Sequence, residues 1–391
     1  MSCYLMKLTP QEPYFFGNEK SFQYKGTEIG DARNRYYIAG EPVPAQTTLI
    51  GMLRYIMLPH KKADRNYSST EVKKNNAAVG ERSFCYGGEN EFGKILKIEP
   101  LFLLRGDERL VVTPFDHSMV KENAIRKANR EKAKKGAEAQ DAKEQAAVNE
   151  AQKETDAPTP VLYTPFTEYE DYLNGEKCYP LLKNKDGEKL ENGYDVKEGI
   201  AHSYMSVEDG TIYTYSDIFA TDTRIGINRS HKKEGFFKKD YVALKEGFAF
   251  GAYIRLLDGV TPPSGISVVY LGQGKSLFTV QFTPVEDGEE QALERKIAER
   301  LDHRVVYCMS DMFLQSDIYA KTRFAVTETK DYRAYTTDAQ GHVSKDTKLY
   351  KLIRAGSVFV PMNQEEFLGL LDNAQVRVIG YNTVVYKKEN A

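Results

Sequence analysis

An alternation of apolar and other residues constrains the fold of this 391-residue chain most strongly. Between Phe248 and Leu256, every even-numbered position is apolar. A side-chain period of two is typical of a β-strand with one buried face. Residues 267–271 and 276–282 flank the turn sequence 272–275 and are predicted to form a hairpin. The sequence therefore favours antiparallel sheets.

Two segments show the period of an amphipathic helix. In 46–58 the apolar residues fall on one helical face, at Leu49, Met52, Leu53, Ile56 and Met57. In 289–303 the apolar face comprises Leu293, Ile297 and Leu301. Strands with a few packed helices predict the α+β fold class. A ferredoxin-like unit in each half fits this order, although pattern alone does not select it.

The length allows two packed domains, which we place at 1–215 and 216–391. The first contains a segment of different composition, 121–157, with ten Ala, nine Lys or Arg and eight Asp or Glu in 37 residues. Its helix propensity is high, yet no apolar stripe would dock it against a core. We expect an exposed insertion that is partly helical or disordered.

Several classes of protein are disfavoured. No run of 18 apolar residues exists, and the first residues lack the core of a signal peptide, so we expect no membrane span and a cytoplasmic protein. The four cysteines are far apart and lack zinc-ligand spacing, which favours reduced, mostly buried thiols. No P-loop, HExxH or dinucleotide fingerprint is present, so we expect neither a metal nor a cofactor.

A cationic block runs from Arg224 to Lys239, with six Lys or Arg and one acid, in a chain of formal net charge −2. Aromatic residues accompany it, and a glycine, Gly226, lies between two isoleucines, where it permits a positive φ. Positive charge with aromatic rings is typical of a surface for single-stranded nucleic acid. The alternative is a solvated, lysine-rich loop. The candidate residues are Arg224, Gly226, Asn228, Arg229, His231, Lys232 and Lys233.

Two further features bear on the same chemistry. Lys275 follows a glycine and could contact an anion together with the backbone, although a plain hairpin turn is the alternative. His202 or His231 could act as acid or base in a metal-independent ribonuclease. Phosphate contact is the simpler role for His231, which stands among Lys and Arg, so we expect no catalytic residue.

Several short motifs, in order along the chain, resemble those of one family. Residues 223–228 resemble its T-x-I-G-I-N element, and 271–275 are similar to its G-G-E-G-K/R turn, with Leu271 and Gln273 departing from it. Further matching segments are 10–17, 42–54, 355–359 and 380–382. The family is the third subunit of Cmr-type (type III-B) CRISPR effector complexes, in the RAMP superfamily.

The resemblance implies two ferredoxin-like (RRM-like) RAMP domains and a non-catalytic role in antiviral defence. Such subunits cap the 5′ handle of the guide RNA (crRNA) and contact the large polymerase-like subunit and a backbone subunit. Carried over by motif, the guide-RNA surface would include Arg54, Arg224, Gly226, Asn228, Arg229 and Lys275. His231, Lys232 and Lys233 rest on charge alone. The alternatives are a RAMP-family endoribonuclease that processes guide precursor and a protein-interaction subunit without an RNA role.

Overall fold

The computed structural model describes residues 2–17, 22–24, 35–62, 66–115, 118–120, 161–163, 203–228, 235–272, 275–301, 303–314, 317–333, 335–337, 343–345 and 348–388. The chain divides into two compact units, Thr113–Ser203 and the remainder, Met1–Val112 with Tyr204–Ala391. Within the smaller unit, β7 (Ser118–Val120) pairs with β8 (Val161–Tyr163). The insertion predicted at 121–157 lies outside the described residues.

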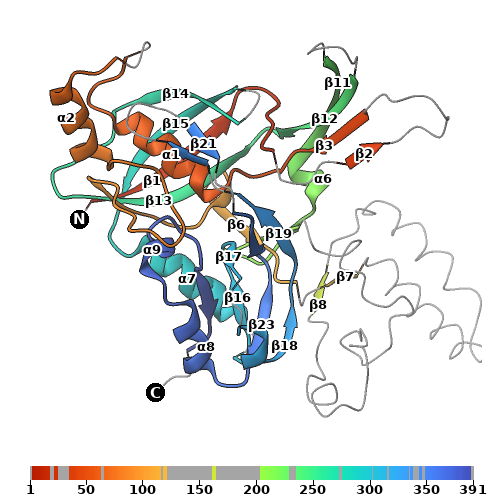
Figure 1. Cartoon of the computed structure of the whole chain (residues 1–391). Helices are drawn as coiled ribbons and strands as arrows, with labels where there is room; N and C mark the ends of the chain where they lie inside the picture. The colour runs from red at the N-terminus through yellow and green to blue at the C-terminus, as the bar shows by residue number, and fades with distance from the viewer. Residues whose placement is uncertain are drawn as a thin grey trace, which may run out of the picture. The chain divides into compact units, whose positions relative to one another are not determined.

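The larger unit is built on a nine-stranded antiparallel sheet (Figure 1). At its centre, β1 (Ser2–Pro10) pairs with β13 (Phe248–Leu256) on one side and β15 (Ser276–Val285) on the other. β13 confirms the strand predicted at 248–256, and the antiparallel pairing of β14 (Ile266–Leu271) with β15 confirms the predicted hairpin. The remaining strands are β4 (Ile95–Ile98), β5 (Phe102–Arg105), β6 (Glu108–Val112), β9 (Tyr204–Ser206) and β10 (Ile212–Tyr213).

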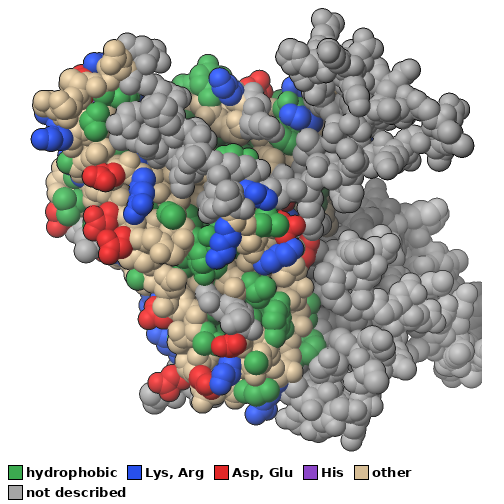
Figure 2. Space-filling view, in the orientation of Figure 1, with side chains coloured by type: hydrophobic (Ala, Val, Ile, Leu, Met, Phe, Trp, Pro, Cys, Tyr) green, Lys and Arg blue, Asp and Glu red, His purple; other side chains and the backbone are tan. Residues whose placement is uncertain are grey.

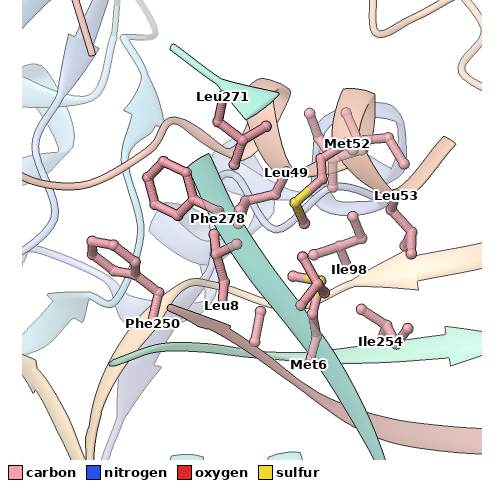
Figure 3. Close-up of a cluster of buried hydrophobic side chains, with 14 of the residues drawn as sticks. Met6, Leu8, Leu49, Met52, Leu53, Ile98, Phe250, Ile254, Leu271 and Phe278 are labelled. Carbon is pink, nitrogen blue, oxygen red and sulfur yellow. The ribbon is translucent and has the colours of Figure 1, made fainter. Parts of the chain in front are cut away.

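Helix α1 (Gln46–Met57) covers one face of this sheet, as its apolar period predicts. Leu49 and Leu53 are fully buried, and they meet Leu8, Phe250 and Phe278 from the strands. Figure 3 shows these side chains converging between helix and sheet. Alternate residues of each strand share a face, so the strand period and the helix period meet in a single core.

A second antiparallel sheet has its own apolar cluster. It comprises β18 (Thr322–Val326), β23 (Val358–Pro361), β16 (Val306–Cys308) and β24 (Val384–Tyr386), in that spatial order. Val306 and Phe359 from these strands pack with Phe367 of α8 (Gln364–Leu371). Helix α7 (Glu289–Glu299), which confirms the second predicted helix, contacts β24.

Smaller elements complete the described chain (Figure 1). One sheet has the order β11 (Phe219–Asn228), β12 (Gly235–Leu244), β3 (Arg35–Ala39) and β2 (Phe22–Tyr24), with β12 and β3 parallel. The others are β17 (Met312–Phe313), β22 (Tyr350–Ile353) and β19 (Thr329–Tyr332), and the pair β20 (Tyr335–Thr337) and β21 (Val343–Lys345). Short helices are α2 (Ser69–Val79), α6 (Tyr215–Ile218), α9 (Ala374–Arg377) and η1 (Tyr319–Lys321).

The fold class is α+β with mainly antiparallel sheets, as predicted. Strands from before and after residue 215 share the nine-stranded sheet, and the boundary at 215/216 stays a prediction. No helix among the described residues is long and apolar enough to cross a membrane.

The turn at Gly380 joins the C-terminal segment to the start of α1. Gly380 has a φ of 85°, and a Cβ there would lie 2.2 Å from Gln46 Nε2. That amide nitrogen donates hydrogen bonds to the carbonyl oxygens of Glu99 and Ile379, at 3.1 and 2.7 Å. The site therefore excludes a side chain by conformation and by space.

We expect Gly380→Ala to lower the free energy of unfolding by more than the about 1–2 kcal/mol that left-handed strain alone costs. The matched control is Gly259→Ala, because Gly259 has a φ of 75° but open space around its Cβ position. Urea unfolding of both variants measures the difference. Equal losses would show that the contact with Gln46 does not limit this position.

Candidate nucleic-acid interface

The cationic block forms much of a β-hairpin, in which β11 and β12 pair over ten residues each. Arg224 lies opposite Lys239, and Asp222 lies opposite Tyr241. Opposed residues of an antiparallel pair share a face, and so do residues two apart, so these four side chains lie on the same face. In Figure 2, Lys and Arg side chains lie beside hydrophobic ones where Figure 1 draws β11 and β12.

Cations and rings alternate on this face. The Arg224 guanidinium carbon lies 4.3 Å from the centre of the Tyr241 ring, and Lys239 Nζ lies 4.9 Å from that of Phe15. The Tyr241 and Phe15 rings are themselves 5.6 Å apart. We call Arg224, Lys239, Tyr241 and Phe15 the cationic–aromatic surface. Cation–π contact holds the charged groups over the rings, contributing about 0.5–1 kcal/mol each at exposed sites.

Arg224 also has an acidic neighbour. Its Nε donates a 2.8 Å hydrogen bond to Asp222 Oδ2, and the two side chains are 51% and 46% exposed. An ion pair this open to solvent is worth little, so an incoming phosphate can compete with Asp222 for the guanidinium. The exposed pair therefore leaves the Arg224 guanidinium accessible to an anion.

The extended segment 13–16 supports this surface from below. The Tyr14 N–H donates to Val242 O and the Val242 N–H donates to Tyr14 O, both at 2.8 Å. The Tyr14 hydroxyl donates to Pro42 O at 2.6 Å, and burial raises its pKa well above the usual value. Phe15 is fully buried, so it serves as a floor for Lys239 and Tyr241 and is not itself open to a ligand.

The turn between β14 and β15 lies against the other side of the same segment. Gly272 has a φ of 74°, and a Cβ there would lie 2.4 Å from Phe15 O. Ser276 Oγ donates to Pro13 O at 3.2 Å. Lys275, exposed in this turn with a φ of 50°, donates its N–H to Gly272 O. The structure thus brings the motif segments 42–54 and 271–275 against residues 13–16 of the motif segment 10–17.

Gly226 has a different conformation from the one expected. It lies within β11, paired with Phe237 of β12, so its backbone is extended. Gly226 does not adopt the positive φ predicted for a turn, because it is paired within the strand. The backbone of Asn228 ends β11 opposite Gly235. Four candidates lie outside the described residues: Arg229, His231, Lys232 and Lys233.

Arg54 lies in the interior and not on a surface. Its side chain, in α1, donates hydrogen bonds from Nε to Val79 O at 2.8 Å and from Nη2 to Gly80 O at 3.1 Å. These carbonyls belong to the C-terminal end of α2, where the helix itself provides no donor. Burial lowers the pKa of Arg54 to about 10. The predicted RNA contact of Arg54 has no support from this position.

Asp222, Phe15 and the contact of Lys239 with the Phe15 ring were not predicted from the sequence as parts of the site. Reading the strand period across the hairpin would have placed Asp222 beside Arg224. No sequence signal places Phe15 under Lys239, because the contact joins segments more than 200 residues apart. Among the described residues, no group of three or more His, Cys, Asp or Glu could hold a metal ion.

We expect Arg54→Met to lower the free energy of unfolding by roughly 1–3 kcal/mol for each of the two carbonyls that lose their donor. Arg82→Met, which removes an exposed arginine, is the matched control and should change stability little. Urea unfolding followed by circular dichroism measures both. A loss no larger than that of the control would contradict the structural role of Arg54.

Comparison with known proteins finds similar solved structures. No curated protein sequence matches the chain. It is similar, at 13% identity and a TM-score of 0.46, to a chain of the "Cryo-EM structure of the Type III-B Cmr-beta bound to cognate target RNA", covering 98% of this chain and 96% of that one. A chain of the same complex with target RNA and AMPPnP is 12% identical, with a TM-score of 0.44, covering 98% of this chain and 95% of that one. A chain of the "Csm3-Csm4 subcomplex in the type III-A CRISPR-Cas interference complex" is 9% identical, with a TM-score of 0.29, covering 99% of this chain and 100% of that one.

A family model identifies the chain across nearly its whole length. The model described as "CRISPR-associated protein (Cas_Cmr3)" matches residues 6–386. This range spans all the motifs on which the sequence resemblance rested, from the segment at 10–17 to the one at 380–382, and it confirms the family. The chain belongs to the Cas_Cmr3 family of CRISPR-associated proteins.

Proposed function

We propose that this protein is the guide-RNA-binding subunit of a type III-B Cmr complex and that it acts without catalysis in antiviral defence. It caps the 5′ handle of the crRNA and bridges the large polymerase-like subunit to the backbone subunits. The observation that carries the RNA-binding role is the cationic–aromatic surface, where two cations lie over two rings on one hairpin face. Membership of the Cas_Cmr3 family supports the proposal for the partner subunits.

Strand order supports two ferredoxin-like units. The strands β1, β5, β13 and β15 lie in the spatial order fourth, first, third, second, with α1 between the first and second in sequence. The strands β16, β18, β23 and β24 have the same order, with α8 before the last. This is the strand order of a split β-α-β-β-α-β unit. In the first unit β14 replaces the second helix, and in the second unit η1 stands where the first helix would be.

The proposed contacts are divided by chemistry. Arg224, Lys239 and Lys275 bind phosphates, because their charges lie at or beside the surface supported by segment 13–16. The side chain of Asn228 reads a base edge of an unstacked nucleotide. Gly226, two residues from Arg224 in β11, has no side chain and so leaves room for RNA to approach the strand. Arg229, by charge and motif, and His231, Lys232 and Lys233, by charge alone, are proposed as further phosphate contacts outside the described residues. Arg54 is left out.

Replacing Arg224 tests the phosphate contact. We expect Arg224→Gln to weaken binding and to make the slope of log affinity against log salt shallower by about 0.7, the value for one phosphate contact on a single strand. Fluorescence polarisation of a labelled crRNA over a salt series measures the slope. Arg295→Gln, which removes an exposed arginine of α7, is the control. An unchanged slope and affinity for Arg224→Gln would exclude this surface from RNA binding.

Replacing Asp222 tests the competition for Arg224. We expect Asp222→Asn to tighten crRNA binding by about threefold, because the amide neither repels phosphate nor pairs ionically with the guanidinium. The control is Asp372→Asn, which removes the carboxylate of another exposed ion pair, with Arg377. Weaker binding by Asp222→Asn than by wild type would show that Asp222 orients Arg224 for RNA. In the same assays the RNA should stay intact, and specific cleavage would contradict the non-catalytic role.

A further inference from the structure

A partly buried ion pair links the C-terminal segment to the support of the cationic–aromatic surface. Arg354, which follows β22, donates from Nη2 to both carboxylate oxygens of Glu41, at 2.9 and 3.0 Å. The two side chains are 21% and 17% exposed, although 313 residues separate them in the sequence. Salt screens a partly buried pair much less than an exposed one.

Arg354 is itself held in place by its own sheet. Its N–H donates to Glu328 O at 2.8 Å, and its Nε lies 3.8 Å from Glu328 Oε1. Burial acts to lower the pKa of Arg354, but the charges of Glu41, Glu328 and Asp311 outweigh it and raise the pKa above its usual value. Arg354 is therefore charged at any physiological pH, and its direction is set by the neighbouring strand.

Glu41 connects Arg354 to the segment that carries Phe15, the floor of the surface. Its N–H donates to Phe16 O at 2.7 Å, one residue from the ring that lies under Lys239. The preceding Gly40 has no room for a side chain, since a Cβ would lie 2.7 Å from Asp240 O and 3.3 Å from the Phe15 ring. The backbone at 40–41 is thus fitted between segment 13–16 and β12, and its position sets that of Phe15.

We propose that Arg354 is a positioning residue for RNA binding, which acts through Glu41 to hold Phe15 beneath Lys239 and Tyr241 without touching RNA. The inference rests on the proposed function of that surface. Its consequence is that RNA affinity depends on the sheet of β17, β22 and β19, because Arg354 directly follows β22. Preorganised cations bind phosphate more tightly than cations that must be ordered on binding.

Two single variants separate positioning from simple charge. Arg354→Met removes a cation and Glu41→Gln removes an anion, so a long-range charge effect would weaken binding in the first and strengthen it in the second. Positioning predicts that both weaken crRNA binding, by about fivefold, in polarisation assays. The matched controls are Arg377→Met and Asp372→Asn, which break an exposed Arg–Asp pair and should leave affinity within about twofold.

A double-mutant cycle and hydrogen exchange complete the test. Arg354→Met should cost less affinity in a Lys239→Gln background than alone, because Lys239 is the cation that the floor orders. Without RNA, amides at 14–16 and 40–42 should exchange faster in Arg354→Met, while those of β16 and β23 stay protected. Opposite shifts by the two single variants, or unchanged exchange at 14–16, would overturn the inference. Failure of Arg224→Gln to change affinity or slope would instead overturn the RNA surface itself.

Discussion

The backbone pairing of Tyr14 with Val242 is the contact on which the arrangement of the site depends. It places an extended segment between β12 and the turn that follows β14, so that three regions distant in sequence meet around Phe15. Every polar group of such a buried segment needs a partner. Neighbouring backbone, including Pro42 O as the acceptor for the Tyr14 hydroxyl, and the Ser276 hydroxyl provide several of them. Without this pairing, Lys239 and Tyr241 would lose the ring beneath them.

The electrostatics of the surface come from modest contacts in a fixed arrangement. Each cation–π contact is weak, and the Arg224–Asp222 pair is open to solvent. In the proposed function, these contacts hold charge at set positions before RNA arrives, which lowers the entropy lost on binding. Contacts beneath the surface supply the rigidity: the full burial of Phe15, the exclusion of a side chain at Gly272, and the partly buried Arg354–Glu41 ion pair.

Much of the local structure could be predicted. The period of two at 247–256 and the helical period at 46–58 correctly indicated β13 and α1, because burial of one face leaves a direct record in the sequence. Arg54 shows the limit. Its motif and charge suggested a surface role, yet α2 ends beside it, and two carbonyls without helical partners draw the guanidinium inside. Gly226 shows the same limit, because its extended backbone depends on pairing with Phe237, which the sequence around Gly226 does not indicate.

The sequence by itself determined the family, the α+β class, the individual strands and helices of the core, and the presence of a cationic, aromatic segment. These follow from short-range periodicity, from charge and from the order of short motifs, all of which can be recognised along the chain without knowledge of its tertiary contacts. Only the tertiary structure decided which cations share a face with rings, which arginine is buried, and that Glu41 and Arg354 form a pair. The reason is physical: such contacts join residues tens to hundreds of positions apart, and their partners are chosen by strand register and packing.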